Sequence, residues 1–204
     1  MRPGRAAPVC EHGRVQRSVA VLVALGVVLL AAGCGSDGTP PIIPEPAPPQ
    51  AAELAWVERS PESGPGLVFR VNRFAVTKTG WESDVEIENR TDISWSLGEN
   101  PVAVEQSFGI MLFATGDMGE LEERNQDAQL PGLRAARRFV PELPARLRPG
   151  DGWRGTISAP GSLASGRWVR VAFGPLVALG DPPDDMGSQF VWITDHAYHL
   201  RARP

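Results

Sequence analysis

The chain has 204 residues, of which 20 are basic and 24 acidic, and its net charge at pH 7 is −4. A negative chain is a poor partner for nucleic acid, because binding to phosphates depends on lysine and arginine. The two cysteines, Cys10 and Cys34, both lie near the N-terminus, so the rest of the chain can form neither a disulfide nor a thiolate metal site.

Residues 1–33 have the three parts of a secretory signal peptide. Four arginines form a basic leader, residues 19–30 are an uncharged apolar segment, and small residues precede Cys34. Twelve apolar residues are too few to span a bilayer comfortably, which takes about 20. A short apolar segment with a basic leader and a small-residue cleavage site therefore predicts a signal peptide.

Residues 30–34 resemble the lipobox of bacterial lipoproteins, with Ala31 where leucine is commoner. The resemblance implies that residues 1–33 are removed and that the Cys34 thiol is lipidated, with fatty acids such as palmitate anchoring the chain to the membrane. The expected location is outside the cytoplasm, on the bacterial cell membrane or on the outer membrane of a host that has one. The alternatives are an uncleaved anchor and an ordinary signal peptide cut nearby.

Cleavage before Cys34 would change the charge of the chain. Four basic residues and one acidic residue precede Cys34, so 16 basic and 23 acidic residues remain and the net charge becomes −7. This value argues against nucleic acid as a partner and against a polybasic grip on anionic lipid.

Residues 34–53 predict a linker. Six of the ten residues from 40 to 49 are proline, a composition that excludes helix and sheet and favours polyproline II. The segment is either a stalk that holds the domain off the membrane or a disordered leader without such a role. The predicted globular domain then covers residues 54–204.

The first predicted strands lie on either side of a turn. In residues 67–76 the apolar side chains change face between Val71 and Phe74, which predicts a bulge or a bend around residues 72 and 73. Residues 81–88 alternate between apolar or small side chains and acidic ones, as in a half-buried antiparallel strand. Asn89 begins the pattern of a glycosylation sequon, which we interpret as a turn that ends this strand.

The middle of the chain is less regular. Short strands are predicted at 93–97 and 102–104, and the apolar run at 108–113 predicts a strand covered on both faces. Residues 120–138 are charged and broken by a Pro-Gly pair, with room for one helical turn on either side. Residues 139–147 carry two prolines, so a strand there must lie at the edge of a sheet.

Residues 153–159 and 167–173 predict a hairpin, and 190–194 predict a last strand followed by a polar tail. Seven or eight short strands with almost no amphipathic helix predict an all-β, antiparallel β-sandwich.

The order of five motifs resembles the immunoglobulin-like accessory domains of bacterial lipoproteins, many of which are known only as domains of unknown function. The matching segments are 85–89, 110–113, 147–150, 155–157 and 169–173. The resemblance implies an extracytoplasmic, non-catalytic immunoglobulin-like domain without a cofactor. The charged segment 120–138 departs from the pattern of that family.

The predicted hairpin places Trp168, Arg170 and Arg154 together on the face that points away from the core. A tryptophan beside arginines on an outward face suits stacking on a glycan or binding to an envelope protein. The alternative is that the second sheet or the segment 120–138 covers this face.

Three further groups of residues carry candidate chemistry. Asp195, His196 and His199 have the donor types of a zinc or copper site, with a solvated tail packed on the sandwich as the alternative. A Ser-His-Asp hydrolase would need one of these terminal histidines as its base. The arginines at 134, 137 and 138 either bind an anion or pair with the acidic residues at 120, 122 and 123.

The sequence therefore predicts a lipid-anchored, non-enzymatic binding or assembly module of the bacterial envelope. Its expected contacts are the membrane, through a lipid on Cys34, and an envelope protein or a glycan. An envelope metal-binding protein is the first alternative, and a hydrolase is a weaker one.

Overall fold

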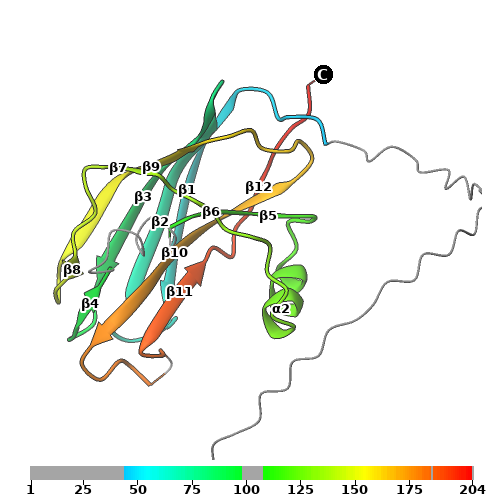
Figure 1. Ribbon diagram of the computed structural model, residues 1–204. Helices are drawn as coiled ribbons and strands as arrows, with labels where there is room; N and C mark the ends of the chain where they lie inside the picture. The colour runs from blue at the N-terminus through cyan, green and yellow to red at the C-terminus, as the bar shows by residue number, and fades with distance from the viewer. Residues whose placement is uncertain (1–43, 98–107, 185, 204) are drawn as a thin grey trace, which may run out of the picture. The chain divides into compact units, whose positions relative to one another are not determined.

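The computed structural model describes residues 44–97, 108–184 and 186–203 (Figure 1). These residues form two antiparallel sheets and one helix, which confirms the predicted all-β sandwich. The predicted signal peptide, Cys34 and the strand predicted at 102–104 lie outside the described residues.

The first sheet has five strands, in the order β1 (Gln50–Ser60), β2 (Leu67–Val76), β3 (Gly80–Asn89), β9 (Gly152–Pro160) and β7 (Arg138–Val140). The predicted linker, residues 34–53, extends too far, because β1 already begins at Gln50. Ala47 is also buried, and its N–H donates to the carbonyl of Leu163 at 2.7 Å. The proline-rich residues just before Gln50 are thus already part of the folded domain.

The local predictions for β2 and β3 are confirmed. The register between the two strands shifts between Val71 and Arg73, which is where the apolar pattern predicts a bulge. The inward residues of β3, from Trp81 to Ile87, are buried, and the acidic residues between them are partly exposed. A period of two is therefore enough to orient this strand.

The second sheet has seven strands: β4 (Ser94–Ser96), β5 (Gly109–Phe113), β6 (Arg134–Ala135), β8 (Arg146–Leu147), β10 (Trp168–Leu179), β11 (Gln189–Ile193) and β12 (Tyr198–His199). The long strand β10 is paired on both sides. Trp168 pairs with Phe113 and with His199, and Val177 pairs with β4 and with β11. Two short strands thus lie end to end on each side of β10, so the number of strands exceeds the predicted seven or eight.

The predicted hairpin of 153–159 with 167–173 is wrong. β9 pairs with β3 and β7 in one sheet, whereas β10 is the centre of the other sheet. The residues between them cross the sandwich, and Leu163 in this connection is buried in the core. Residues that face a common core have the same periodicity in paired strands and in opposite sheets, so the sequence pattern does not distinguish them.

Asn89 forms a structural turn, as predicted. Its side chain is fully buried, and its amide N–H groups donate to the carbonyls of Ile93 at 2.8 Å and Leu147 at 3.2 Å. Its Oδ1 accepts a hydrogen bond from the Thr91 hydroxyl at 2.6 Å. Because Asn89 ends a strand of the first sheet and Leu147 lies in the second, this amide ties the two sheets together.

Helix α2 (Met118–Gln126) covers part of the outer face of the second sheet. Asp117 caps it by accepting the Gly119 N–H at 2.9 Å. Leu121 packs against a small cluster that includes Phe113 and Ala172 on the sheet. Before its Pro-Gly pair, the segment 120–138 thus contains more than the one predicted helical turn. After the pair it contains no helix but the short strand β6 and the first residue of β7.

We expect Glu120→Gln to lower the free energy of unfolding at pH 7 by about 2 kcal/mol. Burial opposes ionisation of Glu120, but hydrogen bonds from Thr115, Arg124 and the Ala114 N–H outweigh it and lower its pKa to about 2. A carboxylate with a lowered pKa stabilises the folded state above its unfolded pKa, near 4.5, and this contribution is lost as the pH falls toward 2. The difference between wild type and variant should therefore shrink over that range.

The measurement is chemical denaturation at a series of pH values, with Glu122→Gln as the matched control. Glu122 is exposed on the same helix, so its replacement removes the same charge without the network. A gap between wild type and Glu120→Gln that stays constant from pH 7 to pH 2 would contradict the role of this carboxylate.

Candidate functional site at the tether end

The face of Trp168 and Arg170 is covered by the chain itself. The Trp168 ring lies 4.7 Å from the ring of His199, and it packs so closely on Gly116 that a Cβ there would be 2.6 Å from the indole. Met118 and Leu121 of α2 belong to the same cluster. Helix α2 and the residues just before it therefore cover this face, which is the internal alternative predicted above.

Arg170 is fully buried under the same cover. Its guanidinium donates to the carbonyls of Gly116 at 3.1 Å and Asp117 at 3.0 Å, and to those of Thr194 at 2.8 Å and Asp195. Burial lowers the pKa of Arg170, although nearby carboxylates oppose this. Arg170 is thus a clamp between the residues before α2 and those after β11.

Arg154 does not join this group. It is exposed on β9, in the other sheet, opposite Glu86. The predicted outward cluster of Trp168, Arg170 and Arg154 therefore does not exist, because it depended on the hairpin.

The terminal histidines have separate partners. His196 Nδ1 lies 2.7 Å from the buried carboxylate of Glu58, and its ring stacks on Trp56 with 5.5 Å between centroids. His199 packs on Trp168 instead. Burial, together with the charge of Glu58, raises the pKa of Asp195. In the part of the chain that the structure describes, no three His, Cys, Asp or Glu side chains are grouped to hold a metal ion.

Two hollows lie beside the turn between β2 and β3, and a third adjoins one of them. The Thr77 hydroxyl accepts the Gly80 N–H at 3.0 Å, and the Thr77 N–H donates to the Gly80 carbonyl at 2.8 Å. A glycine is required at position 80, because a Cβ would lie 2.1 Å from the Ala159 carbonyl oxygen. The turn is thereby held against the end of β9.

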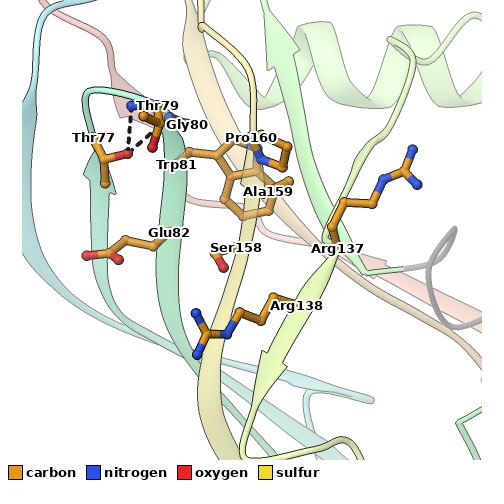
Figure 2. Close-up of a pocket in the computed structure, with 10 residues that line it drawn as sticks. All are labelled: Thr77, Thr79, Gly80, Trp81, Glu82, Arg137, Arg138, Ser158, Ala159 and Pro160. Carbon is orange, nitrogen blue, oxygen red and sulfur yellow. Dashed lines mark hydrogen bonds between the residues drawn. The ribbon is translucent and has the colours of Figure 1, made fainter.

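The first hollow has a volume of about 410 Å³ (Figure 2). Trp81, Ala159 and Pro160 line it, and the guanidinium groups of Arg137 and Arg138 point to opposite sides in this view. A second hollow of about 510 Å³ shares Trp81, Arg137, Ala159 and Pro160 with the first and adds Arg134. Arg138 lines only the first hollow, Arg134 only the second, and Arg137 lines both. The two hollows therefore form one groove, with Arg137 between the other two arginines.

The arginines of this groove do not pair with the acids of 120–123, which corrects the internal alternative predicted for them. Glu120 binds Arg124 at 2.8 Å, and Arg134 donates to the Ser162 carbonyl at 3.2 Å. The carboxylate that lines the first hollow, Glu82, is held by Arg73 at 2.7 Å, and this hydrogen bond raises the pKa of Arg73. The charges of the groove arginines are left for solvent or a ligand.

The groove adjoins one end of the sandwich, which we call the tether end and define as residues 44–49, 77–80, 161–167 and 200–203. Backbone hydrogen bonds join these segments, such as that from the Gly161 N–H to the Thr79 carbonyl at 2.9 Å. The Gln50 amide also donates to the Arg201 carbonyl at 3.2 Å. The third hollow, of about 410 Å³, lies between the entering prolines and the β2–β3 turn.

The tether end is basic. It and the adjoining groove expose seven cations, namely Lys78, Arg134, Arg137, Arg138, Arg167, Arg201 and Arg203. The four segments of the tether end contain one carboxylate, Glu45. Among these cations the sequence pointed only to the three groove arginines, because the other cations are scattered over distant segments and no local motif connects them.

Comparison with protein-family models, with curated proteins and with solved structures finds no match for the chain. Over the ranges that the structure describes, no helix is both long and apolar enough to cross a bilayer.

Proposed function

We propose that this protein is a lipid-anchored, non-catalytic binding or assembly module of the bacterial envelope, of the immunoglobulin-like accessory type. A lipid on Cys34 holds it outside the cytoplasm, and the tether end is its binding surface. The supporting observation is that unpaired cations and three hollows gather at the end where the chain from Cys34 enters the domain.

The length of the tether supports this assignment. Eleven peptide steps separate Cys34 from Glu45, and an extended chain spans at most about 3.6 Å per residue. The entrance of the domain therefore stays within about 40 Å of the lipid. Envelope proteins and glycans near the membrane surface lie inside that reach.

The anchor is tested by Cys34→Ala, with Cys10→Ala as the matched control. We expect the parent and Cys10→Ala to incorporate labelled palmitate and to partition into the detergent phase, because lipidation requires only the Cys34 thiol. Cys34→Ala should incorporate none. If Cys34→Ala takes up the label and partitions like the parent, the lipoprotein assignment is wrong.

A further inference from the structure

We infer that the tether end docks directly on anionic phospholipid headgroups of the membrane that holds the Cys34 lipid. The inference rests on the proposed function, and it names the partner of that surface. It assigns the domain an orientation, with the tether end on the membrane and the opposite end outward.

Charge is distributed unevenly between the two ends of the sandwich. The tether end and the groove together have seven cations and two carboxylates, Glu45 and Glu82, a net charge of +5. The far end, residues 61–66, 90–93, 141–151 and 180–188 without 185, has a net charge of −3. The overall charge of −7 hides this difference, and at physiological salt, where the screening length is about 8 Å, a membrane responds mainly to the end nearest to it.

The cations at the tether end are available for phosphate. Within the described ranges, none of the seven forms an ion pair, although ion pairs occur elsewhere on the sandwich, as between Arg70 and Glu86 at 2.9 Å. The carboxylate that lines the groove, Glu82, is held by Arg73 at 2.7 Å, and at α2 Asp117 caps the helix and Glu120 binds Arg124. One guanidinium group can donate two parallel hydrogen bonds to two oxygens of the same phosphate, so the groove arginines suit a phospholipid headgroup.

The anchor brings this end to the membrane. The first described residues of the chain, 44–49, lie beside the β2–β3 turn and Arg203, so the segment that follows the linker is held at the same end as the cations. Each basic side chain held at an anionic membrane surface favours the bound state by about fivefold. The carboxylates at the far end are repelled by the same surface, which selects one orientation of the domain.

Lys78 provides the probe, because it is the only lysine in the chain and it is exposed at the tether end. The lipidated full-length protein is reconstituted in vesicles of phosphatidylcholine, or of phosphatidylcholine with about one third phosphatidylglycerol. A bulky, uncharged amine reagent then modifies Lys78, and mass spectrometry gives the rate. We expect phosphatidylglycerol to slow the reaction about fivefold or more, and high salt to restore it.

Charge reversal identifies the surface. Arg201→Glu with Arg203→Glu should restore the rate measured in neutral vesicles, because it removes two cations and adds two carboxylates at the tether end. Arg146→Glu with Arg148→Glu makes the same change at exposed positions of the far end and should leave Lys78 protected.

The outcomes separate this inference from the anchor. A protein that floats with both kinds of vesicle while Lys78 reacts at the same rate overturns the inference and leaves the anchor in place. A protein that floats with neither refutes the anchor, and the inference falls with it. Protection of Lys78 in neutral vesicles by inorganic phosphate or by a soluble anionic glycan would assign the tether end to that ligand and overturn the membrane assignment.

Discussion

Replacing Arg170 by methionine is expected to lower the free energy of unfolding by about 3–5 kcal/mol. The guanidinium donates to four carbonyls, two before α2 and two after β11, and methionine can donate to none of them. The four carbonyl groups around this buried position would then lack a hydrogen-bond donor. We expect the free energy lost in this way to exceed the free energy gained by no longer burying a charge. Chemical denaturation of the two proteins gives the difference.

Two further substitutions test whether the geometry of the guanidinium is what matters. Arg170→Lys keeps the charge but has one nitrogen, which cannot reach both pairs of carbonyls, so we expect it to recover less than half of the loss. Arg167→Met removes an exposed arginine three residues earlier and should change stability by no more than about 0.5 kcal/mol. Equal effects at 167 and 170 would show that Arg170 does not act as a clamp.

Trp168→Ala is expected to cost about 3 kcal/mol, at the low end of the range for buried aromatic residues because Trp168 is partly exposed. Its ring fills the space between Gly116 and His199 on the outer face of the second sheet. A thermal melt should show a midpoint lower by roughly 6–12 °C. A midpoint within a degree of wild type would mean that the ring is not covered by the chain and would reopen this face as a binding surface.

A double-mutant cycle makes the same point independently of the size of the loss. In wild type, Gly116→Ala forces a Cβ to within 2.6 Å of the Trp168 ring and should be destabilising. In the Trp168→Ala background that collision is absent, so the same substitution should be close to neutral. Identical effects of Gly116→Ala in both backgrounds would contradict the contact.

Sequence periodicity predicted the strands better than their arrangement. The phase change between Val71 and Phe74 located a bulge, because a one-residue shift moves every later side chain to the opposite face. Ile157 and Val169 were correctly assigned to the core, but they reach it from opposite sheets. The period of the apolar pattern depends only on which side chains are buried. Which strands pair depends instead on where the connection between them runs.

The candidate site was less predictable still. Its seven cations come from the β2–β3 turn, β6, the start of β7 and the residue before it, the crossing connection and the C-terminal segment. These segments are brought together by backbone hydrogen bonds such as Gly161 to Thr79, which have no side-chain signature. The negative net charge argued against binding to an anionic membrane surface. A net charge is a sum over the whole chain, however, and carries no information about where the cations lie.

The first strand also determines how the domain bears mechanical load. The tether enters directly into β1, an edge strand joined to β2 by nine register pairs that run along its length. With the proposed anchor, tension between the membrane and anything held at the far end would pull β1 parallel to its own axis, so its hydrogen bonds would be strained together and would not open one after another. Attachment at this strand therefore gives the domain a shear-loaded joint, the geometry in which a β-sheet resists force best.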